Sequence, residues 1–146
     1  MIKGTEELVD KFNKALKKLG RVYMIKSKGG FLEEDAYRTN KRLQFVVTND
    51  PTYILELTGP YYIKYGELIR DRKIKEFLNM DFNDEKQYYR STSGDNDSSD
   101  DDINTHVKFI KDLYVDSSEK EKNTIADLLN DMLVSYCGYV LLLKNT

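Results

Sequence analysis

The sequence contains no tryptophan, two prolines, eight glycines and a single cysteine, Cys137. One cysteine excludes a disulfide within the chain, which agrees with a reducing compartment. The scarcity of proline and glycine is typical of a folded chain rather than of a linker. We therefore expect a folded cytoplasmic protein.

Long hydrophobic runs are also missing. The longest lies near the C-terminus, Tyr139-Val140-Leu141-Leu142-Leu143, whereas a membrane-spanning helix needs about 18 or more apolar residues in succession. The first residues, Met1 to Glu7, have no apolar run after their basic residue and so do not match a signal peptide. We expect neither a membrane span nor a membrane partner.

The chain does have enough apolar sequence for one core. Its 146 residues are 40% hydrophobic and 33% charged, which predicts a single domain over residues 1–146. Charge is unevenly distributed, because residues 1–42 carry a net charge of +5 and residues 81–146 carry −7. The overall charge of −2 argues against direct nucleic-acid binding, which needs a basic surface.

Periodicity in the first half predicts a helix followed by strands. Apolar residues at helical spacing indicate an amphipathic helix over residues 5–19, with Gly20 as its stop signal. Four segments have the composition of strands, namely residues 21–26, 31–32, 43–48 and 52–58. Residues 52–58 alternate between two faces, and the short turn at residues 49–51 between the last two segments predicts an antiparallel hairpin.

The second half predicts helices. Helical spacing occurs over residues 61–79 and again from Ile103, where Asp102 is suited to be the N-cap. Ser118-Glu119-Lys120-Glu121 has the spacing of a capping box, which opens a strong helix. Gly138 either ends or bends that helix, and residues 139–143 either continue it or add a strand. The expected fold is therefore α+β, a small antiparallel sheet packed with an N-terminal helix and C-terminal helices.

An acidic tract without any apolar residue lies between these parts. Residues 91–102 contain five aspartates, Asp95, Asp97, Asp100, Asp101 and Asp102. Such a tract cannot bury apolar surface, so we expect residues 83–102 to form an exposed acidic loop. The alternating aspartates begin like a calcium-binding EF-hand loop, but Asp100 stands where that loop needs glycine and His106 stands where it needs glutamate.

The residues do not form a recognisable catalytic set. His106 is the sole histidine and Cys137 lies in an apolar helical segment, where thiols are usually inert packing groups. Zinc would need two carboxylates beside these two residues, and neither a nucleophile elbow nor a phosphate-binding loop is present. We expect a binding protein that is not an enzyme and has no cofactor, with a small carboxylate-dependent enzyme as an alternative.

Four short stretches follow a pattern known from one group of proteins. They are Phe45-Val46-Val47, Tyr53-Ile54-Leu55-Glu56-Leu57, Tyr61-Tyr62 and Gly66-Glu67-Leu68-Ile69-Arg70. A sheet strand, an aromatic pair and a helix that starts Gly-x-x-Ile-Arg occur in this order in some small immunity proteins of bacterial polymorphic-toxin systems, which this part of the chain resembles. The resemblance implies a protein that binds a cognate toxin enzyme, of the nuclease or NAD-degrading type, and occludes its active site.

The residues expected to contact such a partner are acidic, aromatic or arginine. Acidic side chains suit the basic clefts of enzymes that handle nucleic acids or dinucleotides, and tyrosine and arginine are enriched at interface hot spots. The candidates are Tyr61, Tyr62, Arg70, Tyr88, Tyr89, Asp95, Asp97, Asp100, Asp101 and Asp102. Two alternatives stay open: a phage-encoded inhibitor of a host defence nuclease that mimics DNA through its acids, and a subunit of a larger assembly that exposes residues 139–143.

Overall fold

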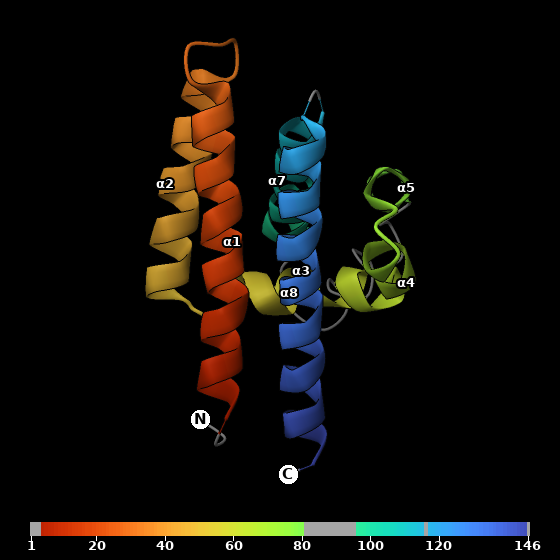
Figure 1. The fold of residues 1–146 in the computed structure, drawn as a ribbon. Helices are drawn as coiled ribbons and strands as arrows, with labels where there is room; N and C mark the ends of the chain where they lie inside the picture. Colours follow the sequence, from red (N-terminus) through yellow and green to blue (C-terminus); the bar gives the residue numbers. More distant parts are fainter. Residues whose placement is uncertain (1–3, 81–95, 116, 146) are drawn as a thin grey trace.

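The computed structural model describes residues 4–80, 96–115 and 117–145, without the side chains of residues 96–102. Every regular element in these residues is an α-helix (Figure 1). In chain order the helices are α1 (Thr5–Ser27), α2 (Glu33–Asn49), α3 (Tyr53–Lys64), α4 (Gly66–Arg70), α5 (Ile74–Leu78), α7 (Asn96–Tyr114) and α8 (Glu119–Lys144). The described fold is all-α, so the predicted α+β fold with its antiparallel sheet is wrong.

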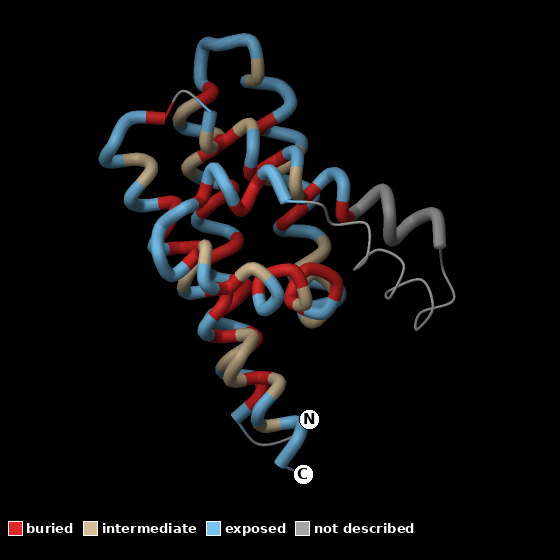
Figure 2. The backbone as a smooth tube through the Cα atoms, turned by 90° about the vertical axis from the view of Figure 1, so that its right-hand side faces the viewer, coloured by how far each residue is buried: buried red, intermediate tan, exposed pale blue. Residues whose placement is uncertain are grey.

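Two long helices form the axis of the molecule. α1 and α8 run antiparallel and pack side by side, so both chain ends lie at the same end (Figure 1). α2 folds back along another side of α1, α7 lies beside the first half of α8, and α3 runs across the long helices. Figure 2 shows the buried residues concentrated where these helices meet, while the α1–α8 pair extends beyond them as a stem that carries both termini.

The core lies between α1, α3, α7 and α8. α1 contributes a stripe whose members are four, three and four residues apart and have exposed fractions of 0%, namely Phe12, Leu16, Leu19 and Tyr23. The residues that share this core include Leu55 and Tyr62 of α3, Ile110 and Leu113 of α7, and Leu129 and Met132 of α8. The helical spacing found in residues 5–19 is therefore that of a helix buried along one face.

α1 does not stop at Gly20 but continues to Ser27. Gly20 is a buried contact between α1 and α2, because a Cβ atom there would lie 2.7 Å from Asn40 Oδ1 and 3.2 Å from Leu43 Cδ1. The glycine lets the two backbones approach closely, which outweighs its low helix propensity. The predicted strand at residues 21–26 is consequently the last part of α1, and residues 31–32 lie in the α1–α2 connection.

The predicted hairpin at residues 43–48 and 52–58 consists of the end of α2 and the start of α3. A short apolar run fits a buried helix as well as a strand. Leu57 and Thr58 are both buried, at 3% and 0% exposed, although neighbouring residues of a strand would point to opposite faces. The turn at residues 49–51 does separate the two elements, and the Nδ2 of Asn13 donates a hydrogen bond of 2.8 Å to the carbonyl of Pro51.

The capping box that opens α8 is confirmed. The backbone N–H of Glu121 donates to Ser118 Oγ at 3.2 Å, and the backbone N–H of Ser118 donates to Glu121 Oε1 at 2.8 Å. The hydrogen bond from the Ser118 backbone N–H lowers the pKa of the Glu121 carboxyl. The helix runs through Gly138 to Lys144, so residues 139–143 are helical and not a strand.

α8 is also long and apolar enough, by length and composition alone, to cross a membrane. Its apolar window is 44% buried inside the fold, and the core helix of a soluble protein passes the same test. The packing of α8 against α1 buries part of this apolar window.

The structure describes the backbone of the last seven residues of the acidic tract, residues 96–102. α7 begins at Asn96, so residues 96–102 have helical backbone and Asp102 is not the N-cap. The rest of the predicted loop, residues 83–95, lies outside the described residues.

Candidate functional site

The residues predicted to contact a partner are not brought together on one described surface. Tyr88, Tyr89 and Asp95 lie outside the described residues. The other acidic candidates belong to the helical backbone of α7, and their side chains are likewise outside the described part: Asp97, Asp100, Asp101 and Asp102.

The two tyrosines of α3 lie in the interior. Tyr61 is 2% exposed and Tyr62 is 1% exposed, so a partner that docks on the outside of this fold reaches neither. Arg70, in the last turn of α4, is exposed, and its Nη2 lies 4.0 Å from Glu67 Oε1. Among the predicted contacts with described side chains, Arg70 is the one at the surface.

Tyr62 instead pairs with the sole histidine. Its hydroxyl lies 2.8 Å from His106 Nε2 in the core. Burial raises the pKa of Tyr62 and lowers the pKa of His106 to about 4. At neutral pH the tyrosine therefore keeps its proton and the imidazole is uncharged, and the two groups share one hydrogen bond between the hydroxyl and Nε2.

Exposed apolar and basic side chains occur together on the α1–α2 hairpin. α1 presents Lys17, Arg21 and Ile25, each four residues apart, and α2 presents Tyr37, Lys41 and Phe45 at the same spacing. Residues four apart lie one above the other on a helix surface. We call these six residues the hairpin face.

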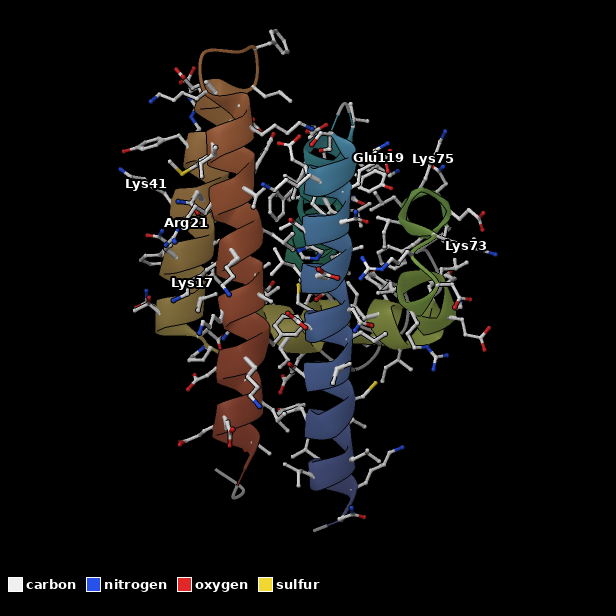
Figure 3. The ribbon with its side chains drawn as sticks, viewed as in Figure 1. Lys17, Arg21, Lys41, Lys73, Lys75 and Glu119 are labelled. Carbon is white, nitrogen blue, oxygen red and sulfur yellow. The ribbon has the colours of Figure 1, made fainter. Side chains whose placement is uncertain are left out.

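The two rows of the hairpin face lie beside each other. The close approach of Gly20 to Asn40 and Leu43 fixes the antiparallel register, so that Arg21 and Lys41 lie at the same level. Figure 3 shows Lys17, Arg21 and Lys41 on the side of the α1–α2 pair that is turned away from α8. The face is therefore open to a partner along the length of the hairpin.

The cations of this face are not neutralised by the described part of the chain. Neither Lys17, Arg21 nor Lys41 forms an ion pair with a described carboxylate. The apolar members are exposed, with fractions of 70% for Ile25, 49% for Tyr37 and 68% for Phe45. Lys41 Nζ lies 4.7 Å from the centre of the Tyr37 ring, a cation–π contact that holds an aromatic and a cation together at the surface.

No protein-family model, curated protein or solved structure matches the chain. Any proposal about function therefore depends on the chemistry of the described residues.

A second candidate site, besides the hairpin face, is a cavity of about 230 Å³ between α2, α3 and α7. Apolar side chains such as Val46, Ile54 and Phe109 line it, and Arg42 and His106 add polar groups. Within the described residues, no group of three or more His, Cys, Asp or Glu side chains is placed to hold a metal ion.

The basic row of α1 had a signal in the sequence. Lys14, Lys17, Lys18 and Arg21 follow helical spacing, which defines one face once the helix continues past Gly20. The row on α2 was missed because no helix was predicted over residues 33–42 and residues 43–48 were predicted as a strand. The cavity had no local signal, since its walls come from three helices that are distant in sequence.

Proposed function

We propose that this protein acts by binding another protein and that the hairpin face makes the contact. The observation that carries the proposal is the mixture on this face of exposed apolar rings and chains with cations that no described carboxylate neutralises. Aromatic residues and arginine are the residue types enriched at interface hot spots. Burying the apolar members supplies affinity, and the cations set orientation and association rate.

The charge of the face defines the kind of partner. Lys17, Arg21 and Lys41 attract an acidic surface, and Ile25, Tyr37 and Phe45 need an apolar patch within it. The net charge of the whole chain is −2, which favours a protein partner over nucleic acid. The proposed partner is therefore a protein with an acidic surface interrupted by apolar groups.

Reversing two charges tests this surface. We expect Arg21→Glu with Lys41→Glu to weaken binding to the native partner about tenfold or more, because both cations then repel an acidic surface. The partner is captured from the native cell with the tagged protein, identified by mass spectrometry, purified and titrated by calorimetry. Both residues are exposed, so the double variant is expected to keep its fold.

The matched control is Lys73→Glu with Lys75→Glu. These exposed lysines change the net charge equally but belong to the α5 region, on the other side of α8 (Figure 3). Binding by this control should stay within about twofold of the wild type. Equal weakening by both double variants, or no weakening by either, would contradict the assignment of the hairpin face.

The resemblance to immunity proteins narrows the proposal to a protein that neutralises a toxin enzyme. Residues 43–48, which were compared with the strand of those proteins, are helical. The resemblance therefore depends on the pair Tyr61-Tyr62 and on α4, which begins at Gly66 as the pattern requires. In this narrower form the acidic tract would enter a basic active-site cleft, while the hairpin face holds the body of the partner.

The acidic tract has its own test. If it occludes an active site, Asp100→Lys with Asp101→Lys should abolish protection of cells that express the cognate enzyme, because reversing two charges changes the net charge by four units at the point of insertion. Asp10→Lys with Asp131→Lys, both exposed on α1 and α8, is the control with the same charge change. Unchanged protection by the variant with Asp100 and Asp101 replaced would exclude the tract as the blocking element. It would not contradict the proposal that the hairpin face binds the partner.

A further inference from the structure

We propose that the cavity between α2, α3 and α7 binds a small organic monocarboxylate with an aromatic or branched aliphatic body. The cavity is separate from the hairpin face. Arg38 and Arg42 lie on the part of α2 that borders the cavity, whereas Lys41 is turned toward the outer side of the hairpin (Figure 3).

The size and lining of the cavity define the body of the ligand. About 230 Å³ is available, and an apolar cavity of about 150 Å³ is enough to hold benzene. Leu43, Val46, Ile54, Leu57 and Phe109 supply apolar walls. The space therefore fits one ring or a branched chain together with a short acidic group.

Two arginines define the charge of the ligand. Arg38 and Arg42 are one turn apart on α2 and both line the cavity, and the guanidinium fork matches a carboxylate. Arg38 Nη2 lies 2.5 Å from Glu34 Oε1, but both side chains of that pair are about three-quarters exposed, at 75% and 76%. Such a surface pair contributes little, so Arg38 can exchange it for a ligand carboxylate.

Two other polar groups of the wall are already in hydrogen bonds. The uncharged His106 ring has its Nε2 in a hydrogen bond with the Tyr62 hydroxyl. Asp35 is the acid on the wall, and its Oδ2 already accepts a hydrogen bond of 2.6 Å from the Tyr23 hydroxyl. A carboxylate only accepts hydrogen bonds, so it fits this wall better than an amine does.

Three ligands that differ only in the polar group test the inference on the full chain. We expect 3-phenylpropionate to bind saturably in ligand-observed NMR and calorimetry, 3-phenylpropanamide to bind at least tenfold more weakly, and 3-phenylpropylamine not to bind. Arg38→Gln with Arg42→Gln should weaken the carboxylate at least tenfold. Arg21→Gln with Arg70→Gln, which removes two exposed charges elsewhere, should leave its affinity unchanged.

A cavity-filling change gives an independent readout. Val46→Phe should abolish binding of the carboxylate while far-UV circular dichroism stays that of the wild type. If Val46→Phe does not fold, the arginine variants and the three-ligand comparison decide alone. Three results would each overturn the proposal. They are equal affinities for the amide and the carboxylate, equal effects of the two double arginine variants on the affinity for the carboxylate, and no saturable binding of the carboxylate at millimolar concentrations.

Discussion

Gly59→Ala is expected to lower the free energy of unfolding by about 1–3 kcal/mol. Gly59 lies inside α3, where an added Cβ atom would be 2.2 Å from Cε1 and 2.3 Å from Cζ of the Tyr136 ring in α8. The ring and the two backbones cannot all keep their places at these distances. The crossing of α3 and α8 therefore depends on the absence of a side chain at this position.

Urea unfolding followed by circular dichroism measures the effect. Gly66→Ala is the matched control, since its Cβ would lie 3.4 Å from Leu133 Cδ2, an ordinary van der Waals contact. That control should change stability by no more than about 0.5 kcal/mol.

Removing the obstructing ring should reverse the sign of the Gly59 substitution. In a Tyr136→Ala background we expect Gly59→Ala to be neutral or stabilising by up to about 1 kcal/mol, because alanine is the better helix former. The four proteins make a double-mutant cycle. An equal loss in both backgrounds would show that Tyr136 is not the cause.

Acidification from pH 7 to pH 4 is expected to remove about 3 kcal/mol of stability through His106 alone. Its pKa falls from 6.5 to about 4 on burial, so the unfolded chain binds a proton that the folded chain does not. The free energy of unfolding therefore decreases as the pH falls from 6.5 to 4. Below pH 4 both states are protonated and this contribution stays constant.

The wild type and His106→Gln should be compared at several pH values between 4 and 7. Glutamine can still form a hydrogen bond with the Tyr62 hydroxyl but does not titrate. The wild type should lose more stability than the variant over this range, while losses from carboxylates are common to both. The charged residues that line the same cavity as His106 are Asp35, Arg38 and Arg42. They are present in both the wild type and the variant, so the two proteins differ only at position 106. Parallel stability curves would contradict a neutral buried histidine.

Elements defined by local interactions were predictable from the sequence. The start of α8 follows from the Ser118–Glu121 capping box, whose hydrogen bonds join residues three apart. The turn at residues 49–51 follows from asparagine, aspartate and proline in succession. Helices over residues 5–19 and 103–114 follow from apolar spacing that their buried faces reproduce.

Residues 43–58 were not predictable in the same way. Their valines, aromatics and alternation are typical of strands, but a segment is helical when helical packing buries it better. Leu55 and Leu57 are buried against a core assembled from α1, α7 and α8, elements that lie far from them in the sequence. The same long-range packing put Tyr61 and Tyr62 inside, although tyrosine is also common at surfaces.

The sequence by itself determined a helix near each end of the chain and an acidic second half, because composition, caps and turns act within a few residues. Only the tertiary structure decided that Gly20 and Gly59 are helix–helix contacts rather than breaks, since their role depends on Asn40 and Tyr136 on other helices. It also decided where charge meets exposed apolar surface. The hairpin face exists because α1 and α2 pack closely enough at Gly20 to bring two rows of side chains together.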